Sequence, residues 1–369
     1  MNFHSGLAFW ALSAALILLG SVVVVSGHPS FHGGGGAPSN PWEAFRNFTG
    51  CLPGENRTGL ADLKRYLRHF GYLPNPVRPS NSNLSDAFDE PLREAILSYQ
   101  RNFRLNATGF LDPSTVDLMA QPRCGVADVV NGTASMRGRG LYSYFPGRPT
   151  WPSQKTNLTY AIISTAGVSA SASTLQGVFS RAFSRWSEVT TLTFAQVDAA
   201  VVEPDITIGF FSGDHGDGEA FDGALGTLAH AFSPPDGRLH LDAAENWVAE
   251  GDVTTASSSS WAVDLESVVV HEIGHLLGLG HSSVEEAIMY PTIRIRAKKV
   301  LLADDDIQGI QSLYGRNPSY NGSTTPPSST TTAMKERDSS GARPSPATAG
   351  WTLAVGGLLV AATASFLFL

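Results

Sequence analysis

The chain has 369 residues, of which 33 are acidic and 25 are Lys or Arg, so its formal net charge at pH 7 is -8. No block rich in Lys and Arg occurs anywhere, and a nucleic-acid partner is therefore not expected. The length exceeds what one hydrophobic core usually organises, so the sequence predicts a folded body of two domains plus ends that belong to neither core.

The N-terminal segment 7–25, LAFWALSAALILLGSVVVV, is an apolar run followed by small residues and a Gly- and Pro-rich stretch. This pattern predicts a secretory signal peptide over 1–27. The run is long and has no basic residues before it, so an uncleaved signal anchor is the alternative. Both interpretations send the body out of the cytosol, where seven Asn-x-Ser/Thr sequons would be N-glycosylation sites. The sequons lie at Asn47, Asn56, Asn83, Asn106, Asn131, Asn157 and Asn321.

Residues 28–140 are expected to form a propeptide. A Gly-, Pro- and Ser-rich leader comes first, and 59–70 and 91–103 then repeat apolar residues at helical spacing. Asp112-Pro113-Ser114 is a helix-start signal for a third helix, which completes an all-α unit near Ala120. Residues 129–140, VVNGTASMRGRG, lack an apolar pattern and predict an exposed, protease-accessible connector.

Residues 141–316 carry a different pattern, which predicts a second domain. LTYAII at 158–163 alternates as a strand, and 173–189 is amphipathic with Ser173 as the expected N-cap. LTFAQV and DITIGFF again have the composition of strands. The order of strand, helix and further strands predicts a mixed α/β layer architecture.

The C-terminal part changes composition after Gly315. Residues 317–340 are rich in Ser, Thr and Pro and predict a solvated stalk, which leaves no room for an accessory domain. Residues 350–369 are apolar with no basic residue after them, whereas a transmembrane helix is usually followed by Lys or Arg on its cytoplasmic side. Small residues around Ser340 and a polar spacer favour a glycosylphosphatidylinositol signal over 341–369, with Ser340 as the attachment site. A C-terminal transmembrane helix is the alternative.

The segment 268–281, VVVHEIGHLLGLGH, has the clearest chemistry. On a helix, His271 and His275 lie one turn apart on one face, so both imidazoles reach one metal ion. Glu272 lies about a quarter-turn round, where it can act as the general base that activates a zinc-bound water. Gly278 lets the helix end, and His281 returns as the third ligand of a catalytic zinc. A surface helix that carries histidines by chance is the alternative, and the third histidine at this spacing argues against it.

This HExxHxxGxxH motif, followed by Met289 in AIMYP, resembles the metzincin zinc peptidases and specifically the matrix metalloproteinases (matrixins). The resemblance implies an α/β metzincin-type catalytic domain, a twisted mixed sheet with three helices, preceded by an all-α three-helix prodomain. It also implies a Met-turn at Met289 beneath the metal, where an ordinary core methionine is the alternative. The stalk and anchor signal look like the plant-type members without a haemopexin domain.

A second cluster of donors lies in a Gly-rich stretch. Three imidazoles and one carboxylate form a closed set suited to a structural zinc, namely His215, Asp217, His230 and His240. Acidic side chains and loop carbonyls nearby are oxygen donors suited to calcium, namely Asp222, Gly223, Leu225, Thr227, Asp242 and Glu245. Such loops are otherwise solvated turns, but the matching positions in matrixins hold these ions. A second calcium ion would use Asp205 and Gly237, although the segment SPPDGRL is shorter and poorer in Gly and Asp than in many members.

The chain contains two cysteines, Cys51 and Cys124. One disulfide between them is the simplest interpretation for an extracellular chain. The segment 122–128, PRCGVAD, instead resembles the matrixin cysteine switch, with Ala127 where the family usually has Pro. In that role the Cys124 thiolate fills the fourth position on the catalytic zinc and excludes water, while Arg123 and Asp128 pair to hold the loop. The two interpretations exclude each other, and the switch is preferred.

The sequence therefore predicts a secreted zinc-dependent endopeptidase, made as a latent zymogen and working as a monomer from the outer face of the plasma membrane through a lipid anchor. Cleavage after Arg137 or Arg139 would activate it, and by resemblance the new N-terminal ammonium would pair with Asp305 or Asp306. An extended peptide from an extracellular or matrix protein would pair with GTLA at 226–229 and place an apolar side chain against Tyr290-Pro291-Thr292.

Two other classes of function are open. A catalytically inactive adhesion or inhibitor module would keep the fold but lose Glu272 or a ligand, and none is lost here. A carbohydrate-binding role for 59–120 is the other, because matrixin prodomains resemble peptidoglycan-binding folds.

Overall fold

The computed structural model describes residues 38, 40–74, 84–130, 132–134, 136, 142–255 and 259–322. The predicted signal segment, most of the stalk, the anchor signal with Ser340, and the two candidate activation sites lie outside the described residues. Among the described residues, no helix combines the length and apolar character needed to cross a membrane.

The N-terminal part of the described chain is helical, as predicted. Its elements are the 3-10 helix η1 (Glu43–Phe48), α1 (Leu60–His69), α2 (Glu90–Asn102) and α3 (Pro113–Met119). Asp89 and Asp112 cap α2 and α3 by accepting backbone N–H groups, and each of these helices has Pro in its first turn. Their apolar faces form one core with Trp42, Phe45 and Phe48, so this part has the all-α architecture that the sequence predicted.

The C-terminal part is built on a six-stranded mixed sheet in the order β1-β7-β8-β6-β4-β5. Its strands are β1 (Arg123–Cys124), β4 (Asn157–Ser164), β5 (Thr193–Gln196), β6 (Ile206–Phe211), β7 (Thr227–Ala231) and β8 (Arg238–Asp242). Only the β7–β8 pair is antiparallel; the other pairs in this sheet are parallel. Two short pairs complete the strands, β2 (Val129–Val130) with β3 (Thr133–Ala134) and β9 (Trp247–Val248) with β10 (Val263–Asp264).

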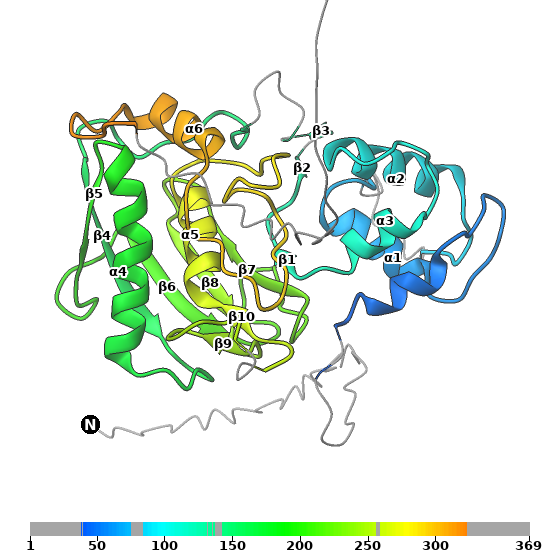
Figure 1. Ribbon diagram of the computed structural model, residues 1–369, viewed down its shortest axis with the longest axis horizontal. Coiled ribbons are helices and arrows are strands. Elements are labelled where there is room, and N and C mark those ends of the chain that lie inside the picture. Colours follow the sequence, from blue (N-terminus) through cyan, green and yellow to red (C-terminus); the bar gives the residue numbers. More distant parts are fainter. Residues whose placement is uncertain are drawn as a thin grey trace, which may run out of the picture. The chain divides into compact units, whose positions relative to one another are not determined.

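In the described part of the chain, this sheet is accompanied by the helices α4 (Ala172–Val189), α5 (Leu265–Leu276) and α6 (Asp304–Tyr314). Helices α4 and α5 pack side by side on one face of the sheet (Figure 1). The indole N–H of Trp186 in α4 donates to the carbonyl oxygen of Val270 in α5 at 2.9 Å, and Trp186 is completely buried. The core that surrounds this contact fixes α5, and with it the histidines that α5 carries.

Two local features differ from the sequence prediction. The N-cap of α4 is Ser171 rather than Ser173, because the Ser171 hydroxyl oxygen accepts the free backbone N–H of Thr174 at 3.1 Å. Strands β2 and β3 lie inside the segment expected to be an irregular connector, where Val129 and Val130 pair with the residues after Gly132.

Candidate active site

Helix α5 carries the HExxH segment, and its start is fixed by a cap. The Asp264 carboxylate accepts both the backbone N–H and the hydroxyl of Ser267, at 2.8 and 2.6 Å. The helix ends at Leu276, and Gly278 then takes a φ of +98°. A Cβ atom at Gly278 would lie 2.3 Å from the carbonyl oxygen of Pro149, so the turn admits only glycine. This turn brings His281 back toward the helix.

The imidazoles of His271, His275 and His281 meet at one point. The Nε2 atom of His275 lies 3.1 Å from that of His271 and 3.2 Å from that of His281. The Cys124 sulfur lies 3.4 Å from the same nitrogen. Four donors at about 2.0 to 2.3 Å from a tetrahedral zinc are separated by about 3.3 to 3.6 Å. The cluster therefore has the spacing that a zinc ion requires.

The other ring nitrogens fix which atom faces the metal. Nδ1 of His271 donates to the carbonyl oxygen of Ile288 at 2.7 Å, and Nδ1 of His275 donates to that of Leu279 at 2.8 Å. A carbonyl oxygen can only accept, so the proton is on Nδ1 and Nε2 has a free lone pair. Burial lowers the pKa of all three histidines, which favours the neutral, metal-binding form.

Glu272 lies beside the cluster without joining it. Its carboxylate is completely buried, and neither oxygen has a nitrogen or oxygen partner within hydrogen-bond distance among the described residues. Burial raises the pKa of Glu272 to about 8, and burial together with the charge of Glu272 raises the pKa of the Cys124 thiol. A divalent cation among these donors would lower both pKa values. The arrangement thus fits a cationic centre with an acid/base group next to it.

Cys124 reaches the cluster because its segment joins the sheet. Strand β1 pairs parallel with β7, and the backbone N–H of Arg123 and Gly125 donate to the carbonyls of Gly226 and Ala229 at 3.1 and 2.8 Å. On the other side, the Cys124 N–H donates to the carbonyl of Pro291 at 2.9 Å. Segment 122–128 therefore occupies the edge of β7 that the sequence assigned to a peptide substrate. Both cysteines are free thiols, so the alternative disulfide is absent.

Arg123 and Asp128 form the predicted ion pair, with a guanidinium nitrogen 2.7 Å from a carboxylate oxygen and both side chains fully buried. The guanidinium also lies 3.6 Å from the ring centroid of Phe70 in the helical part. The Tyr72 hydroxyl donates to the other Asp128 oxygen at 2.8 Å. Side chains of the helical part therefore hold the 122–128 loop in place.

The second predicted cluster is also assembled. One carboxylate oxygen of Asp217 lies 2.8 to 2.9 Å from ring nitrogens of three histidines, His215, His230 and His240. Burial lowers the pKa of His230 to about 4 and lowers that of His240 as well, so these rings are neutral. Together these donors form the second zinc site.

The candidate calcium residues lie in the loop before β7, at the start of β7, at the end of β8 and just after β8. Burial, together with neighbouring carboxylates, raises the pKa of Asp222 to about 6 and that of Glu245 to about 8. Asp242 shares this environment, and one oxygen of Glu245 is buried without a partner among the described residues. By contrast, the Asp205 carboxylate contacts the Lys155 ammonium and accepts the N–H and hydroxyl of Thr159, so it already has a cation.

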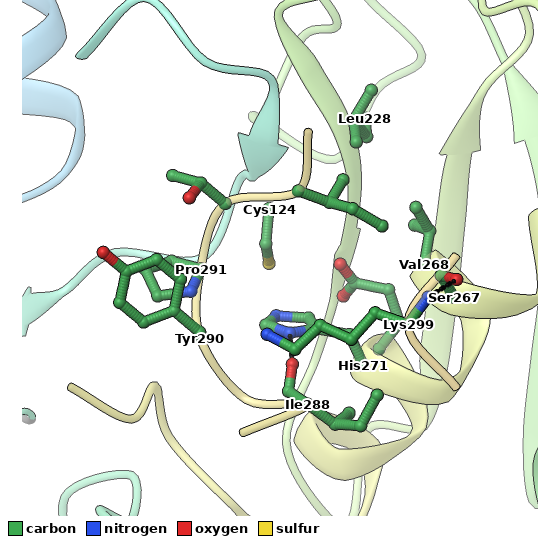
Figure 2. A pocket seen from close by; sticks show the side chains of 12 residues that line it. Cys124, Leu228, Ser267, Val268, His271, Ile288, Tyr290, Pro291 and Lys299 are labelled. Atoms are coloured by element: carbon green, nitrogen blue, oxygen red, sulfur yellow. Dashed lines mark hydrogen bonds between the residues drawn. The ribbon is translucent and has the colours of Figure 1, made fainter. Parts of the chain in front are cut away.

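A pocket opens beside His271 and Glu272. Its wall includes Tyr290, Pro291 and Thr292, as the sequence predicted, and also Leu228 of β7. Figure 2 shows Cys124 pointing toward His271 at one end, and the Lys299 side chain lying along the pocket. Lys299 was not predicted; its backbone N–H donates to the Ser267 hydroxyl at 2.8 Å and its ammonium donates to the Glu285 carbonyl at 2.7 Å.

Met289 lies under the helix that carries the histidines. A Cβ atom at Gly274 of α5 would lie 2.2 Å from the Met289 sulfur, so the methionine packs directly against the helix backbone. The Asp306 carboxylate accepts the backbone N–H groups of Ile288 and Met289 at 2.8 and 3.0 Å. Asp306 thus anchors the turn, a role that the run of three aspartates in the sequence does not reveal.

Five of the seven sequons fall on described residues, and their asparagines are all exposed: Asn47, Asn56, Asn106, Asn157 and Asn321. The other two, Asn83 and Asn131, lie outside the described residues.

Comparisons with known proteins agree with this geometry. Residues 150–315 match the family described as Matrixin, and residues 56–119 match the one described as a putative peptidoglycan binding domain. The chain is 51% identical over 317 residues to Metalloendoproteinase 2-MMP of Arabidopsis thaliana, covering 81% of each chain. It is 44% identical over 311 residues to Metalloendoproteinase 1 of Glycine max, covering 84% of this chain and 96% of that protein. The Hatching enzyme of Paracentrotus lividus is 38% identical over 273 residues, or 74% of this chain and 41% of that protein.

Proposed function

The chain belongs to the matrixin family of zinc metalloendopeptidases, and we propose that it is a secreted endopeptidase, made as a latent zymogen, that hydrolyses peptide bonds of extracellular proteins. Its proposed parts are a signal peptide (1–27), a propeptide (28–140), a catalytic domain (141–316), a stalk (317–340) and an anchor signal (341–369). The observation that carries the latency is the Cys124 sulfur, 3.4 Å from Nε2 of His275.

Latency in this proposal has two components. The thiol takes the donor position that water would need, and strand β1 takes the β7 edge on which an extended peptide would pair. Cleavage of the connector, after Arg137 or Arg139, releases both at once. The Asp305 carboxylate, buried near the Ser282 hydroxyl, is then the better candidate for the new N-terminal ammonium, because Asp306 already accepts three backbone N–H groups.

Glu272 is the proposed general base. Bound zinc supplies a Lewis acid that polarises the scissile carbonyl and acidifies water. The Glu272 carboxylate takes the proton from the attacking water and passes it to the leaving amine. Its carboxylate is buried and has no nitrogen or oxygen partner among the described residues, so both oxygens become available for this proton once the Cys124 thiol leaves.

The pocket beside Glu272 is proposed to receive the side chain after the cut. Leu228, Val268 and Ile293 make its lining largely apolar, which favours a medium or large apolar side chain. Lys299 lies along this pocket. Its backbone N–H bonds to Ser267 and its ammonium bonds to Glu285, so its aliphatic stem would limit how deeply a substrate side chain can enter.

Calcium at Asp222, Asp242 and Glu245 is proposed because three neighbouring carboxylates with raised pKa values, of which Asp242 and Glu245 are buried, favour a bound cation. Carbonyls of Gly223, Leu225 and Thr227 would complete the shell. A second calcium at Asp205 and Gly237 has less support, since Lys155 already neutralises Asp205. N-glycosylation, monomeric state, and attachment to the outer leaflet through a lipid at Ser340 rest on the sequence patterns alone.

The test is to express the zymogen and assay it with a quenched-fluorescence peptide before and after cleavage of the connector. Glu272→Ala should lose about 10² to 10⁴ in kcat with the fold retained. Unchanged turnover in that variant would contradict the role of Glu272. A cleaved wild-type chain that binds zinc but cuts no peptide would instead favour the inactive adhesion or inhibitor module.

A further inference from the structure

We propose that Asp128 of the propeptide is a positioning residue for the catalytic zinc site, acting through His281, and that the latent chain consequently holds its zinc more tightly than the thiol alone explains. This inference rests on the latency proposed above and adds a second contribution of the propeptide to the metal site.

The three zinc-binding histidines differ in what holds their outer nitrogen. His271 and His275 donate from Nδ1 to backbone carbonyls of Ile288 and Leu279, which belong to the catalytic domain and stay with it. Nδ1 of His281 instead lies 2.7 Å from a carboxylate oxygen of Asp128. One of the three ligands is therefore oriented by a residue that activation would remove.

The hydrogen bond between His281 and Asp128 is buried, and further hydrogen bonds hold the carboxylate in place. Both side chains are essentially fully buried, so water does not compete for the hydrogen bond. The same Asp128 oxygen accepts from Arg123 at 2.7 Å, and its other oxygen accepts from Tyr72 at 2.8 Å. Asn102 of α2 donates to the Tyr72 hydroxyl at 3.3 Å. Arg123 thus holds the Asp128 oxygen that orients the His281 ring, whereas Tyr72 and Asn102 lie on the side of the other carboxylate oxygen.

A carboxylate is a stronger acceptor than a carbonyl, and it makes the opposite ring nitrogen a better metal donor. Loss of such a partner typically weakens metal binding by about 10- to 100-fold. Removal of the propeptide would then loosen one of the three protein ligands that remain, at the moment when the thiol also departs. Asp128 therefore has two roles: it pairs with Arg123 to shape the loop, and it orients His281 on the metal.

The experiment measures zinc release from the full chain to a chromogenic chelator. Every chain carries Glu272→Ala, which prevents self-cleavage, and Cys124→Ser, which removes the thiol from the metal site. Into this background are placed Asp128→Asn, or Tyr72→Phe as the matched control. Tyr72→Phe removes one hydrogen bond to Asp128 but leaves the oxygen that faces His281 unchanged. The zinc at His215, Asp217, His230 and His240 provides an internal reference phase.

We expect Asp128→Asn to release the catalytic zinc at least about tenfold faster, while Tyr72→Phe stays close to its parent. The reference phase should be unchanged in all chains. Hydrogen exchange of segment 122–128 reports whether β1 remains paired with β7. A release rate equal to the parent, with β1 still protected, would overturn the proposal, as would equal acceleration by Tyr72→Phe.

If β1 separates in the Cys124→Ser chains, the same comparison is made with Cys124 present and cobalt in place of zinc. The cobalt–thiolate absorption band then shows that the loop is seated. Faster cobalt release from Asp128→Asn with the band retained supports the proposal, and an unchanged rate contradicts it. None of these measurements requires peptide hydrolysis, so failure of the proposed peptidase activity would be seen separately.

Discussion

The two zinc clusters contain similar donors but differ in where the donors come from. All four donors of the second cluster come from residues 215–240, and its carboxylate donor, Asp217, belongs to the same stretch of chain. The catalytic cluster takes three from residues 271–281, whereas its fourth donor, Cys124, lies 151 residues before His275. A cluster that is closed by its own loop has no position left for water, whereas one closed by a removable segment gains that position when the segment leaves.

The surroundings of the two clusters follow the same division. The catalytic cluster is fully buried, and Glu272 stands beside it with no hydrogen-bonding nitrogen or oxygen in the described part of the chain. In the second cluster, the Asp217 carboxylate already contacts the three histidines. Similar donors therefore suit the second cluster to a structural role and the catalytic cluster to a reaction that the propeptide can control.

The largest effect should come from deleting one histidine in each cluster. His275→Ala should abolish peptidase activity, by at least about 10³-fold, because a metal ligand is lost, with only a modest change in melting temperature. His230→Ala should destabilise the catalytic domain by about 3 kcal/mol or more, lowering Tm by roughly 6 to 12 °C. Parallel peptide assays and thermal unfolding check both. Loss of stability in the first variant and not in the second would reverse the assignment.

Removal of the thiol should give the next largest effect. Cys124→Ser leaves the fourth position to water, so the uncleaved chain should cut a fluorogenic peptide at least about tenfold faster than the uncleaved wild type. Because β1 still lies on β7, activity should remain below that of the cleaved enzyme. A Cys124→Ser zymogen that stays as latent as the wild type would contradict the switch. Cys51→Ser, which alters the other buried thiol, serves as the control.

A smaller effect concerns substrate choice at the catalytic cluster. Lys299→Ala should raise kcat/KM for peptides with a long aromatic side chain after the cut by about threefold to tenfold, and leave peptides with Leu there nearly unchanged. Lys299→Met keeps the stem length without the ammonium and should behave like the wild type. Equal changes for both classes of peptide would indicate that Lys299 does not limit the pocket.

The smallest effect tests how α5 is anchored independently of any metal. Burial would raise the pKa of Glu266, but hydrogen bonds from Arg185 and Arg181 of α4 outweigh it and hold the pKa below its ordinary value. A carboxylate with a lowered pKa stabilises the fold above its unfolded pKa, and this contribution is lost as the pH falls through the folded pKa. Glu266→Gln should therefore cost about 1 kcal/mol or less at pH 7 and nearly nothing at acidic pH. Denaturant unfolding at neutral and acidic pH measures this difference, and a constant deficit at both would contradict it.

Local sequence patterns accounted for much of the structure. The spacing of Leu60, Leu63 and Leu67 predicted α1, and the spacing of His271 and His275 predicted a shared metal, because helix geometry makes residues one turn apart neighbours. The N-cap of α4 was misplaced by two residues, since Ser171 and Ser173 are chemically equivalent and only the backbone angles distinguish them. The position of Lys299 at the pocket could not be predicted, because a lone lysine belongs to no motif and its placement depends on hydrogen bonds to Ser267 and Glu285.

By itself, the sequence predicted the residues of the two zinc clusters, the helical part that precedes the mixed sheet, and the family, because each depends on residues within one or two turns or on a motif of fixed spacing. Tertiary structure alone decided that Asp128 meets His281, that Asp306 holds the Met289 turn and that Lys155 neutralises Asp205. These contacts join segments 17 to 153 residues apart. Their formation depends on how the sheet and its helices pack, and packing is set by the summed burial of many side chains rather than by any local pattern.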